Sequence, residues 1–129
     1  MAKRAKKSPA RALAVLAARI AQDRHAQDIV VLNLEGISPV TDFFVIFTSA
    51  SDRQMRAVAQ EIMDEAAKLG AKAYNASGME TGKWILLDFV DVVVHVFDEE
   101  HRKFYDLELI WGDAPHIRWR RPKPKTSGQ

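Results

Sequence analysis

The segment from Lys83 to Phe97, KWILLDFVDVVVHVF, constrains the fold more than any other part of the chain. It is rich in β-branched and large apolar residues, which favour strands, and two aspartates interrupt it near its middle. We expect two antiparallel strands joined by a tight turn at Phe89-Val90, although valine tolerates poorly the left-handed backbone that such turns prefer. The chain should therefore build part of its core from a β-hairpin.

The two sides of this hairpin differ in composition, because successive side chains of a strand point to opposite faces. The predicted turn pairs Trp84 with His95, Leu86 with Val93 and Asp88 with Asp91. One side is uniformly aliphatic and is predicted to be core: Ile85, Leu87, Val92, Val94 and Val96. The other side mixes large apolar groups with charge, as binding hot spots do, and is predicted to bind a protein. Its residues are Trp84, Leu86, Val93, His95 and Phe97, ending in the Asp88 and Asp91 pair.

The remaining patterns predict three helices and three further strands. Helices are expected from Pro9 to about Gln27, from a capping box at Ser51 and Gln54 to Gly70, and after Asp98 with an apolar stripe of Phe104, Leu107, Ile110 and Trp111. Strands are expected at 28–34, 43–48 and, weakly, 72–76. With 129 residues, the chain should be a single α/β domain of the α+β type, with a mixed sheet of about five strands.

Charge is unevenly distributed along the chain. Residues 1–8 and 116–129 carry nine basic and no acidic residues, whereas 9–115 hold 10 basic residues and all 17 acidic ones. We expect a folded acidic domain at 9–115 between two disordered basic segments, because the tail prolines and lysines cannot bury a core. An acidic body is steered towards basic protein surfaces, and basic tails can contact RNA phosphates or only aid solubility.

Three helices cannot cover both faces of a five-stranded sheet, since one helix covers about two strands. Part of the sheet should therefore meet a partner, a second copy of the chain or water, and a tryptophan patch seldom only faces water. Alternatively, the first helix covers Trp84 and the aspartates merely shape the turn.

Several classes of function fit the sequence poorly. The absence of cysteine excludes disulfides and thiolate sites and suits a cytoplasmic location, and no apolar run is long enough for a membrane span. No cofactor or metal site is expected. A nucleotidyltransferase would need clustered carboxylates, but Asp88 and Asp91 flank a turn and form no Asp-x-Asp motif. An RNA-binding module using Trp119 among tail arginines is a further alternative, as is a solvated tail.

Residues 28–115 resemble the bacterial ribosomal silencing factor S family, also called Iojap-like. The resemblance rests on Asp28 with its strand, on TDFFVIFTSASDRQMRAVAQEI at 41–62 and on WILLDFVDVVVHVFDEEHRKFYDLELIWGDAP at 84–115. Two departures concern the turn and the preceding loop: Val90 stands where the family commonly has glycine, and Ser77 where a Glu-Gly pair is usual.

The resemblance implies a nucleotidyltransferase-like fold without that fold's catalysis. It also implies binding to the large ribosomal subunit through the ribosomal protein numbered fourteen, which obstructs subunit joining and represses translation. The family's interface residues fall on Trp84, Asp88, Asp91, His95 and Tyr105 of this chain. A homodimer is also compatible with such a patch.

Overall fold

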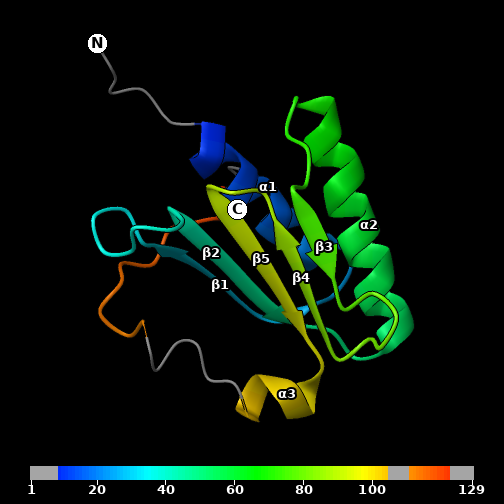
Figure 1. Cartoon of the computed structure of the whole chain (residues 1–129). Coiled ribbons are helices and arrows are strands. Elements are labelled where there is room, and N and C mark those ends of the chain that lie inside the picture. Colours follow the sequence, from blue (N-terminus) through cyan, green and yellow to red (C-terminus); the bar gives the residue numbers. More distant parts are fainter. Residues whose placement is uncertain (1–8, 105–110, 123–129) are drawn as a thin grey trace, which may run out of the picture.

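The computed structural model describes residues 9–104 and 111–122, which form a single α+β unit (Figure 1). The helices and strands follow one another as α1 (Pro9–Asp23), β1 (Gln27–Asn33), β2 (Phe43–Thr48), α2 (Asp52–Lys68), β3 (Asn75–Ser77), β4 (Trp84–Asp88), β5 (Val92–Phe97) and α3 (Glu99–Phe104). The predicted fold class is confirmed, since the described ranges form five strands in one mixed sheet and three helices. Among the described helices, none is long and apolar enough to span a membrane.

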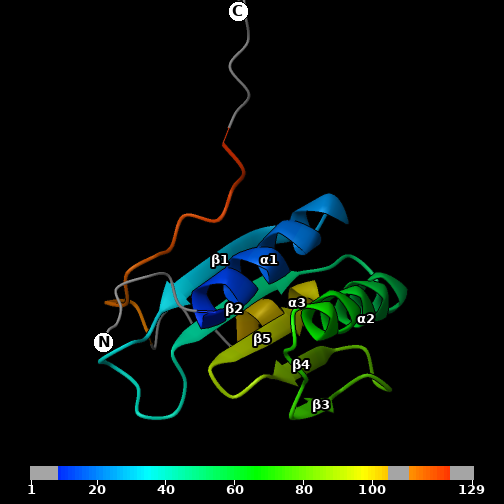
Figure 2. The ribbon, with the colours of Figure 1, turned by 90° about the horizontal axis from the view of Figure 1, so that it is seen from above.

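The five strands lie in the order β1-β2-β5-β4-β3. The central pair, β2 and β5, is parallel, and the other neighbours are antiparallel. Helices α1 and α2 pack on the same face of the sheet, as the view from above shows (Figure 2). The opposite face, called here the open face, is covered by neither of these helices.

The main core lies between the sheet and the two long helices. The five aliphatic residues predicted for the inner side of the hairpin are all completely buried there: Ile85, Leu87, Val92, Val94 and Val96. From the helices come mainly alanines and β-branched residues, which allow close approach to the strands: Ala14, Ala17, Ala18, Val58, Ala59 and Ile62. This part of the sequence prediction is confirmed.

Both long helices end where local signals stop them. The α1 helix ends at Asp23, earlier than predicted, because His25 adopts a left-handed backbone (φ 66°) and the Ala26 N–H bonds the Ala21 carbonyl at 2.9 Å. The α2 helix begins as predicted, with the Gln54 N–H donating to Ser51 Oγ at 3.1 Å. It ends before Gly70, which takes the left-handed conformation (φ 85°).

The register of the hairpin corrects the prediction. Trp84 pairs with Phe97, Leu86 with His95 and Asp88 with Val93, so the turn lies at Val90-Asp91 and the two aspartates do not face each other. The cause is Val90, whose φ of 77° lets the Asp91 N–H bond the Phe89 carbonyl at 2.9 Å. Because the predicted pairing is shifted by an even number of residues, the assignment of side chains to faces is unchanged.

The bounds of the edge strand also differ from prediction. The strand occupies 75–77 instead of 72–76. The α3 helix is described for Glu99–Phe104, and the Phe104 side chain is 76% exposed. Tyr105, Leu107 and Ile110 fall outside the described residues.

The prediction that residues 116–129 bury nothing is wrong for Ile117 and Trp119. Both side chains are buried against the main core. Because its indole is buried, Trp119 cannot stack on RNA bases as the RNA-binding alternative requires.

Candidate protein-binding face

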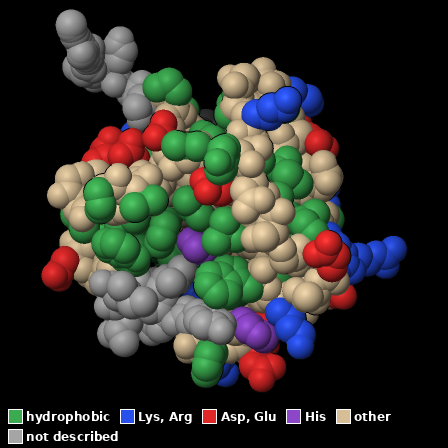
Figure 3. Space-filling model, viewed as in Figure 1, with side chains coloured by type: hydrophobic (Ala, Val, Ile, Leu, Met, Phe, Trp, Pro, Cys, Tyr) green, Lys and Arg blue, Asp and Glu red, His purple; other side chains and the backbone are tan. Residues whose placement is uncertain are grey.

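Apolar side chains gather in the middle of the open face, over β2, β5 and β4 (Figure 3). Leu32, Ile46 and Phe97 form a small second cluster on this side of the sheet. Packed against the cluster, and only partly buried, are Val30, Phe44, Trp84 and Trp111. The open face therefore holds an apolar cluster, and several large side chains packed against it are still reached by solvent.

Four of the predicted binding residues come together here. Trp84 and Leu86 lie on β4, next to Val93 and His95 on β5, and all four side chains belong to the open face. Trp84, Leu86 and Val93 are half-buried, whereas His95 is only 4% exposed. The alternative in which α1 covers the indole is not what the fold shows, since α1 packs on the other face.

His95 contacts the indole of Trp84 and fixes its orientation. The Trp84 Nε1–H donates to His95 Nδ1 at 3.2 Å, and the Trp84 ring lies 5.0 Å from the ring of Phe97. Phe44 meets the imidazole edge-on at 4.6 Å. Burial in this apolar surrounding lowers the pKa of His95 to about 4, because the charged imidazolium loses its hydration. The ring is therefore neutral at physiological pH.

A glycine in the preceding loop also seats Trp84. Gly78 has a φ of 87°, and a Cβ at this position would lie 1.9 Å from the Trp84 carbonyl oxygen. The loop can approach the start of β4 this closely only because residue 78 has no side chain. Backbone and side chain of Trp84 are thus both fixed by neighbouring groups.

Carboxylates cluster at the turn end of the face. Asp88 accepts a hydrogen bond from the Val90 N–H at 2.8 Å, while Asp91 is exposed and its carbonyl oxygen bonds the Asp42 N–H at 3.0 Å. The pKa of Asp42 is raised, first by burial and then by the negative charges of Asp91 and Glu35. Sequence reasoning missed Asp42, but a parallel pairing of Phe43 with Val92 would have placed it beside Asp91.

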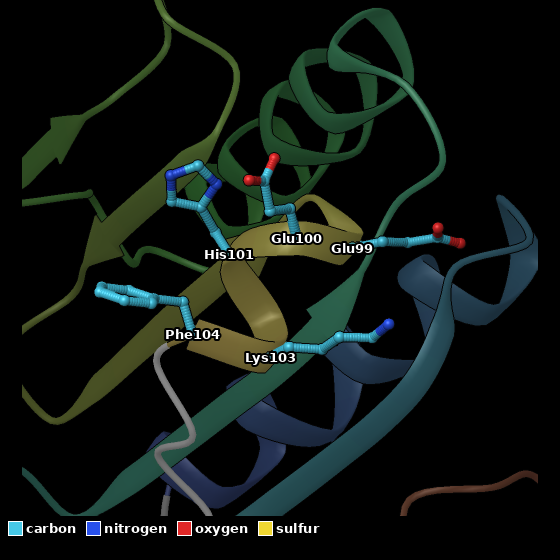
Figure 4. Close-up of a pocket in the computed structure, with 5 residues that line it drawn as sticks. All are labelled: Glu99, Glu100, His101, Lys103 and Phe104. Atoms are coloured by element: carbon cyan, nitrogen blue, oxygen red, sulfur yellow. The ribbon is translucent and has the colours of Figure 1, made fainter.

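The α3 helix lies at the opposite end of β5. Its cap is the predicted one, since Asp98 Oδ1 accepts from the His101 N–H at 2.7 Å and lies 2.9 Å from His101 Nδ1. His101 and Phe104 point to the same side of this short helix, whereas Glu99 points away (Figure 4). Tyr105, the remaining predicted binding residue, lies just outside the described residues.

The described ranges contain no group of three or more histidine, cysteine or acidic side chains placed to hold a metal ion. The Asp88 carboxylate accepts a hydrogen bond within its own turn, and Asp88 pairs with Val93 across the hairpin instead of with Asp91. What the open face offers chemically is an apolar platform bordered by carboxylates. Such a surface suits recognition of a protein with apolar and basic side chains.

Comparison with known proteins agrees with the resemblance found in the sequence. A family model described as "Ribosomal silencing factor during starvation" matches residues 6–129. A ribosomal silencing factor of Bacillus subtilis is 45% identical over 100 residues, which cover 78% of this chain and 85% of the relative. The chloroplast protein Iojap of Arabidopsis thaliana is 40% identical over 106 residues, covering 82% of this chain but 44% of that longer protein.

Solved structures show the same fold. A crystal structure of a protein from Chromobacterium violaceum superposes with a TM-score of 0.77 at 27% identity and covers 93% of this chain and 95% of that one. A crystal structure from Bacillus halodurans gives a TM-score of 0.68 at 38% identity, covering 83% and 94%.

Proposed function

Since this chain belongs to the family of ribosomal silencing factors during starvation, we propose that it silences translation by covering a surface of the large ribosomal subunit. The open face docks on a basic ribosomal protein, the one numbered fourteen, where the large subunit meets the small one. Bound there, the protein obstructs subunit joining. The action is steric and makes or breaks no bond.

The observation that supports this proposal most is the partial exposure of Trp84, held by its neighbours, on a sheet face that α1 and α2 leave uncovered. Trp84 is held by His95 and Phe97, so little side-chain freedom is lost when it docks. Asp42 and Asp91 border the same face and carry charge of the sign that attracts a basic partner. A second copy of the chain would pair through this face as well, so a homodimer would compete with the ribosome.

Trp84→Ala tests the proposed anchor. We expect large-subunit affinity to fall by about 30-fold or more, corresponding to the roughly 2 kcal/mol that defines a binding hot spot. Co-sedimentation with purified large subunits measures binding, and sucrose-gradient analysis of subunit joining measures silencing.

Leu69→Ala is the control, because Leu69 is a large apolar residue with 64% exposure at the end of α2, on the other side of the sheet, and it should change neither readout. Unchanged co-sedimentation of the Trp84 variant would remove this face as the docking site. A wild-type protein that leaves subunit joining intact would remove the proposed mechanism.

A further inference from the structure

The C-terminal strap, residues 115–122, extends the sheet beyond β1. The Asn33 N–H donates to the Pro115 carbonyl oxygen, and the Ile117 N–H donates to the Val31 carbonyl oxygen, both at 2.8 Å. Between these bonds, Leu32 and His116 form an antiparallel bridge. The strap therefore lies along the edge of the sheet, next to the open face.

Side chains fasten the strap to α1. Trp119 is buried in the main core, and its carbonyl oxygen accepts from Arg19 Nε at 2.7 Å. Arg121 makes two hydrogen bonds with the carboxylate of Asp23, at 3.0 and 2.9 Å. Hydrogen bonds to β1 and contacts with α1 thus fix the strap on the folded domain, where it forms a ridge.

The outward side of this ridge is basic. His116, Arg118 and Arg120 are exposed and alternate with the buried Ile117 and Trp119. The guanidinium of Arg120 is held over the Trp119 ring, 4.8 Å from its centroid. Asp23 balances the charge of Arg121, but within the described ranges no carboxylate pairs with Arg118 or Arg120. Two cations are thus presented from a rigid support.

We propose that Arg118 and Arg120 bind the phosphate backbone of ribosomal RNA beside the docked ribosomal protein. Guanidinium groups match phosphate oxygens with paired N–H donors, and two residues along an extended strand are separated by about 7 Å. RNA is the main anionic surface that surrounds a ribosomal protein. This inference rests on the proposed function: the acidic border of the open face meets the basic protein, and the basic strap meets the RNA.

The salt dependence of RNA binding tests the ridge directly. The full-length chain is titrated against protein-free large-subunit ribosomal RNA at potassium chloride concentrations from about 50 to 200 mM, a range over which lost phosphate contacts change affinity strongly. R118Q/R120Q should reduce the slope of log affinity against log salt by about 2, one for each phosphate contact. The single variants R118Q and R120Q should each reduce it by about 1 and serve if the pair fails to fold.

Two further double variants test whether the slope depends on the charge of residues 118 and 120 and on their position in the strap. R118K/R120K keeps both cations and should retain the slope, whereas R53A/K72A removes two exposed cations elsewhere and should leave the slope unchanged. An unchanged slope in R118Q/R120Q would overturn the inference. It would also be overturned if R118Q/R120Q weakened binding to whole large subunits but not to protein-free RNA, because the ridge would then contact a protein.

Trp84→Ala distinguishes this inference from the proposed function. It should reduce binding to complete subunits while leaving the salt slope on protein-free RNA at the wild-type value. Loss of that slope in Trp84→Ala would show that the open face carries the RNA contact, and the inference would fail. If Trp84→Ala leaves subunit binding intact while R118Q/R120Q reduces the slope, the ridge survives and the proposed docking face does not.

Discussion

At the scale of single residues, His95 is the position where burial changes side-chain chemistry most. Its Nδ1 accepts the indole N–H of Trp84, so the neutral ring carries its hydrogen on Nε2. That Nε2 atom is buried and has no hydrogen-bond partner among the residues that the structure describes. Through its Nδ1 hydrogen bond, His95 orients the Trp84 indole on the open face.

His95→Phe should change how stability depends on pH. The folded-state pKa of His95 is lowered from 6.5 to about 4, so between these values the unfolded chain binds a proton that the folded chain does not. The wild type should therefore lose stability as pH falls through 6.5, by about 2 kcal/mol between pH 7 and 5 from this group alone. His95→Phe should lack this contribution, as measured by urea unfolding at several pH values.

His95→Asn provides the control for the indole contact, since it also lacks the titrating ring but offers an amide oxygen to the Trp84 N–H. Both variants should show the same flattened pH dependence, and the Asn variant should bind large subunits better than the Phe variant. A wild type and a Phe variant with parallel pH profiles would contradict the burial of a neutral imidazole at this site.

At the scale of elements, the β4–β5 turn carries a residue that fits its conformation poorly. Val90 is exposed, so its side chain contributes little packing, yet its backbone adopts a φ of 77° that is unfavourable for a β-branched residue. Val90→Gly should raise the free energy of unfolding by up to about 1 kcal/mol, because the strain removed exceeds the extra entropy of the unfolded glycine chain. Urea unfolding checks the change. Val40→Gly, at another exposed valine without a positive φ, should instead lower stability.

The same turn explains which features of the sheet sequence alone could predict. The core and open faces follow from alternation, which survives a register error of two residues, so Trp84, Leu86, Val93 and His95 are assigned to the right side. The pairing itself depends on the backbone of Val90, for which residue type gives the wrong expectation.

The strap was missed for a different reason. Ile117 and Trp119 alternate with polar residues as an edge strand does, but the neighbouring prolines and lysines favoured a disordered tail. Its partner is β1, more than eighty positions away in the chain. Local composition cannot reveal that such a short segment finds its hydrogen bonds and core contacts through tertiary structure.

At the scale of the whole molecule, charge is separated between two parts of one surface. At the turn end of the open face, burial and the negative charges of Asp91 and Glu35 raise the pKa of Asp42. The strap along β1 carries the opposite charge. A surface arranged in this way fixes the orientation of the protein against a partner that has both basic protein and phosphate groups, because the reversed orientation brings like charges together.

Asp42→Asn should therefore affect folding and binding in opposite directions. Burial and the neighbouring carboxylates raise the pKa of Asp42, which means that the folded state disfavours its charge, so the neutral amide should increase the stability of the free protein at pH 7. A basic partner compensates the same charge, so removing it should weaken large-subunit binding by about two- to fivefold, mainly through slower association at low salt. Asp64→Asn on α2, remote from the open face, should leave association unchanged. Urea unfolding and stopped-flow association measure the two effects, and equal association rates for wild type and Asp42→Asn would show that the acidic border does not face a basic partner.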